Sequence, residues 1–207
     1  KLFEAERSMG LNVDINRSFN LPDSLSLNVN LLLFYTRVDK PMRLISTAQD
    51  KLSFHQLDDY LDTRGTEINS VWERGNFKFL LGYTHADVQE HSAHGVHAYP
   101  LVPNNRLNTV FIYEREDDLR IGLEAYYYGH QELNNGTTSR DYWIVGLMME
   151  KAMSGDLSMF LNFENLTDTR QTRWEPLYTG SLANPIFNDI YAPLDGYVIN
   201  GGVKLRL

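Results

Sequence analysis

Apolar and polar residues alternate along most of this chain with a period of two, which is the pattern of a β-strand with one apolar and one polar face. The alternation is most regular at residues 196–207. One face there carries Tyr197, Ile199, Gly201, Val203, Leu205 and Leu207, and the other carries Val198, Asn200, Gly202, Lys204 and Arg206. A closed membrane barrel needs a long one-sided strand in this place, because its last strand must pair with its first so that no edge faces lipid.

The same alternation predicts nine up-and-down strands. They lie at about residues 8–16, 25–36, 62–73, 77–84, 105–114, 119–130, 143–149, 157–164 and 196–207. Short turns at 20–24, 74–76, 115–118 and 152–156 alternate with long connections at 39–60, 90–104, 132–139 and 167–195. The first long connection has room for a short hairpin of its own. Bacterial outer-membrane barrels alternate short turns and long loops in this way.

Strand length and the placement of aromatic residues favour a membrane barrel over a soluble sandwich. Strands of about 10 residues match a tilted membrane strand and exceed the ~5–6 residues usual in globular sheets. The aromatic residues on the apolar face fall at two levels, as in the aromatic girdles of a barrel. Near the long loops lie Tyr35, Tyr83, Tyr127, Trp143, Phe163 and Tyr197, and near the short turns lie Trp72, Phe77 and Tyr113. We therefore predict an all-β fold, an antiparallel up-and-down transmembrane β-barrel.

An odd number of strands does not close a single-chain bacterial barrel, in which the count is even. The sequence also starts at Lys1 without a signal peptide, inside what we expect to be a structural element. Either a strand is missing at the N-terminus or the count of nine is wrong, and the first alternative fits a fragment of a longer protein.

The amino-acid composition excludes only a few classes of partner and site. The formal net charge of −8 argues against nucleic acid as a partner. The absence of cysteine excludes disulfides, thiolate metal sites and cysteine nucleophiles, but it leaves the cellular compartment open. No apolar run approaches the ~18 residues of a membrane helix, whereas membrane strands alternate and would escape a hydropathy scan.

Several stretches carry motifs. Residues 159–168, MFLNFENLTD, end in asparagine-leucine-x-aspartate, residues 63–68 contain a Gly-x-Glu strand start, and residues 99–106, YPLVPNNR, form a loop-to-strand junction. In this order and spacing the chain resembles the C-terminal part of a TonB-dependent outer-membrane receptor. The loop at residues 184–193, NPIFNDIYAP, is similar to those of receptors from Bacteroides-type bacteria.

The resemblance implies that residues 1–207 are the last nine strands of a 22-stranded barrel, without the N-terminal plug domain and the TonB box. It implies active import of a scarce nutrient across the bacterial outer membrane, with no cofactor and no enzymatic activity. The partners would be the TonB complex acting through the plug, the barrel-assembly machinery, lipid and lipopolysaccharide, and a small nutrient ligand. The assembly signal would comprise Tyr197, Val203, Leu205 and Leu207, although the family's signal usually ends in Phe rather than Leu.

The second long connection carries the one group of residues with metal-ligand character. His91, His94 and His97, with His85 nearby, could converge on zinc, copper or haem iron if the loop folds around them. We favour the simpler interpretation, a solvated loop made flexible by Gly95, because no carboxylate stands at a metal-ligand spacing.

The last long connection offers exposed aromatic side chains. Trp174, Tyr178, Phe187 and Tyr191 could stack on a siderophore, a corrinoid or a sugar, or they could pack the loop onto the barrel mouth. Charged residues on the polar face are expected to be wall residues that bond plug or water rather than a catalytic pair. We place there Glu67, Glu124, Glu150, Glu164, Arg64, Lys78, Arg120 and Arg206.

Three hypotheses for the function follow. The first is part of a TonB-dependent receptor that imports a siderophore, haem, a metal, cobalamin or a glycan. The second is another outer-membrane barrel, either a passive porin or a barrel enzyme with a Ser/His/Asp set at its rim. The third is a soluble β-rich binding domain, which would leave the two levels of aromatic residues unexplained.

Overall fold

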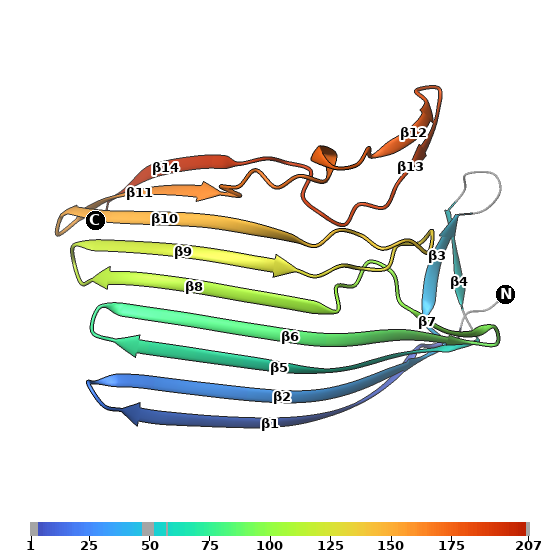
Figure 1. The fold of residues 1–207 in the computed structure, drawn as a ribbon, viewed down its shortest axis with the longest axis horizontal. Coiled ribbons are helices and arrows are strands. Elements are labelled where there is room, and N and C mark those ends of the chain that lie inside the picture. The colour runs from blue at the N-terminus through green and yellow to red at the C-terminus, as the bar shows by residue number, and fades with distance from the viewer. Residues whose placement is uncertain (1–3, 47–51, 57, 206–207) are drawn as a thin grey trace.

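Nine long strands form one continuous antiparallel sheet in the computed structural model, which describes residues 4–46, 52–56 and 58–205. Their order is β1-β2-β5-β6-β8-β9-β10-β11-β14, so each long strand lies beside the next one along the chain (Figure 1). They are β1 (Arg7–Leu21), β2 (Leu25–Asp39), β5 (Tyr60–Arg74), β6 (Phe77–Ser92), β8 (Asn105–Arg115), β9 (Leu119–Tyr128), β10 (Tyr142–Ser154), β11 (Leu157–Glu164) and β14 (Val198–Leu205). The prediction of nine up-and-down strands is therefore confirmed.

The connections at one end of the sheet contain further short elements. The expected hairpin in the first long connection is present as β3 (Met42–Ser46) and β4 (Leu52–Gln56). The last connection holds a 3-10 turn, η1 (Gln171–Arg173), and a second hairpin of β12 (Tyr178–Ser181) and β13 (Asn184–Phe187). Among the described residues no helix is long and apolar enough to cross a membrane.

The interpretation of residues 90–104 as a loop is wrong in its first half. Strand β6 continues to Ser92, and β7 (Gly95–Ala98) pairs back onto it. The extension is polar, so it lacks the apolar alternation that marks the rest of β6. Its backbone groups are satisfied by pairing with β5, in which Tyr60 lies opposite His91.

The register places one apolar face along the whole sheet. A single row of cross-strand neighbours runs from β2 to β14 and carries an apolar residue on every strand: Leu27, Trp72, Phe79, Phe111, Leu123, Leu147, Phe163 and Ile199. A slip of one residue in any pair would turn that strand's apolar side chains to the other face. We call this the outward face, because it is the face that a barrel presents to lipid.

Among the described residues no second layer covers the outward face. The buried apolar side chains of the described residues are Leu133, Tyr191 and Ala192, and all three lie in connections rather than in the sheet. Leu123, in the middle of the outward face, is 45% exposed. A soluble sandwich would bury such a face against another sheet, so the arrangement argues against the soluble domain.

The two levels of aromatic side chains lie on this outward face as predicted. At the short-turn level Phe77 packs against Phe111 and Tyr113, with ring centroids 5.8 and 5.1 Å apart. At the long-loop level Tyr127 packs against Trp143, and its hydroxyl donates to Asp141. On β6 the two levels are marked by Phe77 and Tyr83, which are six residues apart. Six residues span about 20 Å along a strand. This length is close to the ~25 Å height of the apolar band of outer-membrane barrels.

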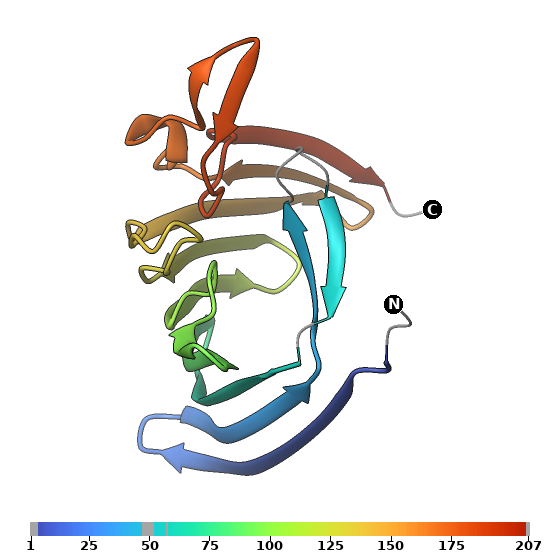
Figure 2. The same cartoon turned by 90° about the vertical axis from the view of Figure 1, so that its right-hand side faces the viewer.

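The opposite, polar face is concave. Figure 2 shows the sheet curving around the β3–β4 hairpin, which stands on its concave side at the long-loop end. Arg43 of β3 donates to Glu90, a residue of the polar face of β6. The assignment of Arg64 to the polar face is wrong, because Arg64 lies opposite Tyr35 and Asp87 in an outward row. Arg206, also expected on the polar face, lies outside the described residues.

Candidate ligand-binding surface at the barrel mouth

Three stacked side chains line the concave face at the long-loop end of the sheet. Strand alternation turns Arg106 of β8, Tyr128 of β9 and Tyr142 of β10 inward, in one cross-strand row. The Arg106 guanidinium lies 5.0 Å from the centroid of the Tyr128 ring, and Tyr128 and Tyr142 are stacked at 5.0 Å with their planes 13° apart. We call these three residues the aromatic ladder. A cation above stacked rings can bind a planar or anionic group by stacking and charge.

A carboxylate lies directly below the aromatic ladder. Tyr126, two residues from Tyr128 and on the same face, donates from its hydroxyl to Glu124. The Glu124 side chain lies across Gly146 of β10, where a Cβ would meet its carboxylate and its stem. The glycine thus lets this carboxylate lie flat on the wall below the rings.

The last connection forms a shelf beside the aromatic ladder. The Tyr142 hydroxyl donates to the backbone carbonyl of Tyr191, and Trp174 Nε1 donates to the Tyr191 hydroxyl at 2.9 Å. Tyr142 and Trp174 pack against the buried cluster of Leu133, Tyr191 and Ala192. Burial raises the pKa of the Tyr191 phenol above its ordinary value. Trp174 and Tyr191 therefore hold the loop on the mouth of the barrel.

A fully buried amide fixes the shelf. Gln171 has 0% exposure, and its Oε1 accepts hydrogen bonds from the backbone N–H groups of Tyr191 and Ala192 at 3.0 and 3.2 Å. Its Nε2 donates to the Asp189 carbonyl at 2.6 Å and to Glu175 at 3.0 Å. One side chain thus ties η1 to the end of the same connection, some 20 residues further on.

Replacing this amide should loosen the whole shelf. In a Gln171→Leu variant of the full-length protein the N–H groups of Tyr191 and Ala192 would be buried without an acceptor, at about 1–3 kcal/mol for each. We expect their amide protection in hydrogen exchange to fall at least tenfold. A Thr172→Ala variant, which changes the exposed neighbour, is the control. Unchanged protection in Gln171→Leu would contradict the role given to this side chain.

The β3–β4 hairpin is attached to the other side of the concave face. Arg43 Nη1 lies 2.7 Å from Glu90 Oε2, with both side chains mostly buried, and its guanidinium lies 5.6 Å from the Tyr99 ring. The hairpin and the shelf therefore stand at the same end of the barrel, on either side of the mouth (Figure 2).

The three histidines do not converge. His91 lies on the outward face, stacked on Tyr60 at 4.2 Å with its Nε2 3.2 Å from Asp62, whereas His97 lies opposite Glu90 on the concave face. His94 lies in the exposed turn between β6 and β7. Among the described residues no set of three His, Cys, Asp or Glu side chains could hold a metal ion. A part for any one of these histidines in ligand binding stays a prediction.

The remaining predicted site residues lie apart from the aromatic ladder. Tyr178 packs on Phe187 in the exposed β12–β13 hairpin, with ring centroids 6.2 Å apart, and its part in ligand binding stays a prediction. Tyr197, Val203 and Leu205 are exposed on or beside β14, the edge strand of the sheet. Leu207, the last residue of the predicted assembly signal, lies outside the described residues, and the signal too stays a prediction.

The sequence did not single out the aromatic ladder. Tyr126 and Tyr128 alternate with outward Tyr127, so the sequence does contain the signal: large aromatic rings on the polar face of a strand. Alternation along one strand does not show which residue of the neighbouring strand lies opposite each side chain. The stack of Tyr128 on Tyr142 depends on the register between β9 and β10.

Comparison with known proteins reveals likeness in structure alone. No family model and no curated protein matches the sequence. The chain is similar to the ferric-catecholate import receptor Fiu of E. coli K12, with a TM-score of 0.62 and 16% identity over 95% of its length. It is similar to the FrpB iron transporter of Neisseria meningitidis (TM-score 0.64, 12% identity, 97% covered) and to the pyoverdine receptor FpvA of Pseudomonas aeruginosa (0.63, 19%, 97%).

The chain has the fold of a TonB-dependent receptor barrel. It spans 27% of the Fiu chain, 31% of the FrpB chain and 30% of the FpvA chain. The nine strands thus have the fold of an open segment of such barrels, with β1 and β14 at the two edges of the sheet. The concave face of this segment corresponds to the lumen, and the aromatic ladder lies on the lumenal wall at the mouth.

Proposed function

We propose that this chain is the C-terminal barrel portion of an outer-membrane receptor that imports a scarce nutrient with energy from TonB. The observation that carries the proposal is the match of 95–97% of the chain to barrels of import receptors at TM-scores of 0.62–0.64. The apolar outward face, which no other described element covers, supports a place in the membrane. The TonB complex, a plug domain and the barrel-assembly machinery would be partners of the full-length protein.

The aromatic ladder is the proposed point of contact for the nutrient. It combines two stacked phenol rings, one guanidinium and a nearby carboxylate on the lumenal wall, between the shelf and the β3–β4 hairpin. Its stacked rings and guanidinium suit recognition of a ligand, so we propose a transporter rather than an enzyme. The similar structures are described as receptors for ferric catecholate and pyoverdine and as an iron transporter, which makes an iron complex the first nutrient to test.

Deletion of the full-length gene tests the function. Cells lacking it are grown with iron-siderophore, haem, zinc, cobalamin or one glycan limiting in turn, and a growth defect relieved by excess of one nutrient would identify the imported class. Loss of that uptake in a strain lacking TonB would support active transport. Uptake that is independent of TonB would favour a passive porin instead.

The Tyr128→Ala variant tests the proposed contact. Removing the central ring of the aromatic ladder should lower uptake at limiting nutrient roughly three- to tenfold, because a stacked aromatic contact contributes about 0.5–1.5 kcal/mol. Uptake of the labelled nutrient by whole cells measures this effect, with receptor levels matched by immunoblot. Tyr128→Phe keeps the ring and should transport as the wild type does. Equal uptake by Tyr128→Ala would exclude the aromatic ladder as the contact.

A further inference from the structure

The β12–β13 hairpin stands apart from the long sheet and exposes apolar side chains. In the described part of the chain its two strands pair only with each other. Leu182 at the tip of the hairpin is 85% exposed, and Phe187 and Ile186 are 73% and 65% exposed. An isolated two-stranded hairpin is at best marginally stable in water, and a third strand or a covering surface is needed to stabilise it. We therefore expect this hairpin to have a partner.

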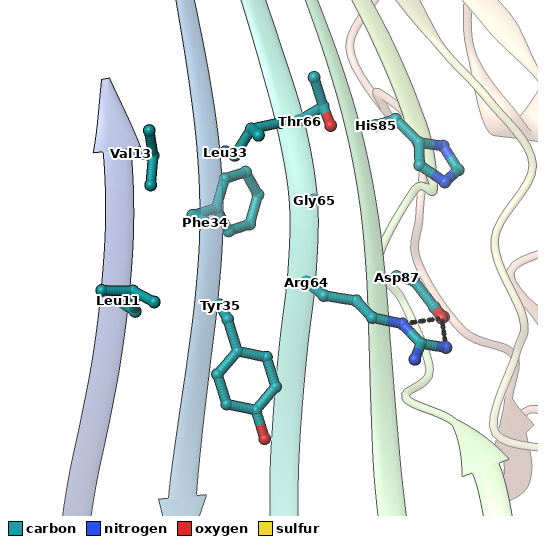
Figure 3. Close-up of a pocket in the computed structure, with 10 residues that line it drawn as sticks. All are labelled: Leu11, Val13, Leu33, Phe34, Tyr35, Arg64, Gly65, Thr66, His85 and Asp87. Carbon is teal, nitrogen blue, oxygen red and sulfur yellow. Dashed lines mark hydrogen bonds and ion pairs between the residues drawn. The ribbon is translucent and has the colours of Figure 1, made fainter. Parts of the chain in front are cut away.

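The hairpin also carries no charged side chain. Residues 176–188 contain no Asp, Glu, Lys or Arg. The long strands differ in this respect: on their outward face Arg64 of β5 donates from Nη2 to Asp87 Oδ2 of β6 at 2.8 Å (Figure 3). Exposed strand edges usually carry charged residues or proline, which prevent pairing with a further strand. The hairpin lacks the charges that would keep another strand away.

Of the two outer edges of the hairpin, the edge of β12 is the one open to pairing. The backbone N–H of Asn188 donates to the Leu177 carbonyl at 2.8 Å, so these residues form a hydrogen-bonded pair. Such pairs alternate with non-bonded pairs along antiparallel strands. The alternation turns the backbone groups of Tyr178 in β12 and of Pro185 in β13 toward the outer edges. Because proline has no N–H, the β13 edge lacks a donor there, whereas the β12 edge keeps one.

The hairpin extends past β14, the last strand of the sheet, in both Figure 1 and Figure 2. Strand β14 begins at the long-loop end, and its outer edge pairs with no described strand. In a closed up-and-down barrel the first strand pairs antiparallel with this edge, so it ends at the long-loop end. We call the line where these two strands meet the closure seam, and the long loop that follows the first strand the first-strand loop. The first-strand loop of such a barrel emerges beside β12 and β13.

We propose that the β12–β13 hairpin clasps the closure seam of the full-length barrel. Its partner is an extended segment of the first-strand loop of the same protein, paired with the β12 edge as a third strand. This segment brings uncharged side chains against the packed rings of Tyr178 and Phe187. The proposal rests on the proposed function, because only a complete receptor barrel has this seam. The clasp ties the two ends of the barrel wall together at the mouth.

Photo-crosslinking of the full-length receptor in cells tests the clasp. The reporter is Thr179→p-benzoylphenylalanine, at an exposed position within β12, and the captured peptides are identified by mass spectrometry. We expect the captured segment to come from the first-strand loop of the same molecule. The control is Asn135→p-benzoylphenylalanine, at an exposed position in the connection between β9 and β10, which should not capture that loop.

Two proline variants, each carrying the Thr179 reporter, test which edge pairs. Tyr178→Pro removes an N–H from the outer edge of β12, and Phe187→Pro removes one from the outer edge of β13. Each change also removes one ring of the packed pair, so the two variants are matched. We expect capture to fall about fivefold in Tyr178→Pro, as for the loss of one hydrogen bond. Capture in Phe187→Pro should stay near that of the reporter alone.

Capture of a second copy, of another protein, or of nothing above the control level would overturn the clasp. Equal loss of capture in the two proline variants would overturn it as well. Cell fractionation and nutrient uptake separate this failure from failure of the proposed function. A receptor that lies in the outer membrane and imports its nutrient but shows any of these results disproves only the clasp. A receptor absent from the outer membrane disproves both.

Discussion

A full-length receptor carrying Leu123→Arg is expected to reach the outer membrane at a small fraction of the wild-type level. Leu123 lies between Phe111 and Leu147 in the apolar row that crosses the sheet, inside the band that the two aromatic levels bound. A guanidinium at that depth would face hydrocarbon, at a cost of about 2–4 kcal/mol for a barrel residue near the membrane centre. Immunoblots of outer-membrane fractions, with heat-modifiable migration as the measure of folding, give the result.

The matched control is Val110→Arg. Val110 lies on β8 opposite Glu124, so its side chain is on the lumenal face, one position along the strand from outward Phe111. An arginine there would be hydrated and would lie beside a carboxylate, and we expect near wild-type assembly. Equal loss in both variants would mean that the two faces of the sheet do not differ in environment, which would contradict a membrane barrel.

The second large effect is expected for Gly65→Ala. A Cβ at Gly65 would lie 2.5 Å from Cζ of Phe34 and would also overlap the backbone carbonyl oxygen of His85 on the neighbouring strand. Because one of these groups is backbone, the sheet itself must shift, and we expect a cost of about 3 kcal/mol or more. Folded receptor should lose its heat-modifiable form at a clearly lower temperature than the wild type.

Two further variants test whether the predicted loss of stability comes from these two contacts. Gly155→Ala, in the turn between β10 and β11, adds the same methyl group where no atom lies within 4 Å, and it should leave stability unchanged. Combining Gly65→Ala with Phe34→Ala removes the ring but leaves the His85 carbonyl, so stability should recover only in part. Full recovery would show that the aromatic ring alone requires the glycine.

The sheet could be predicted from the sequence because a row of apolar residues crosses its outward face on every long strand. Strands without an apolar face could not be predicted in this way. The continuation of β6 to Ser92 is polar, so no alternation of apolar and polar residues marks it or its pairing with β7. The face of Arg64 was misassigned although Trp72, at the same parity along β5, was assigned correctly to the apolar face. An arginine beside the membrane band is compatible with the outward face once Asp87 compensates its charge.

The candidate site was harder to predict, because it depends on contacts between distant residues. Trp174 and Tyr191 were expected either to bind a ligand or to pack the loop, and the hydrogen bond between them supports packing. Gln171 carries no motif, and its importance follows only from its burial and its four hydrogen bonds. The imidazoles of His91 and His97 are near in sequence, but strand pairing turns them to opposite faces.

The unequal lengths of the strands make the long-loop rim of the sheet oblique. Strands β1, β2 and β5 have 15 residues and β6 has 16, whereas β9 has 10 and β11 has 8 (Figure 1). At ~3.3 Å per residue, β6 exceeds β11 by about 26 Å along the strand direction. The barrel wall is therefore tall on one flank, and on the other it is low and topped by the shelf. In the receptor that we propose, a molecule that diffuses toward the lumen would be stopped by the tall flank and could enter over the low one, past the aromatic ladder.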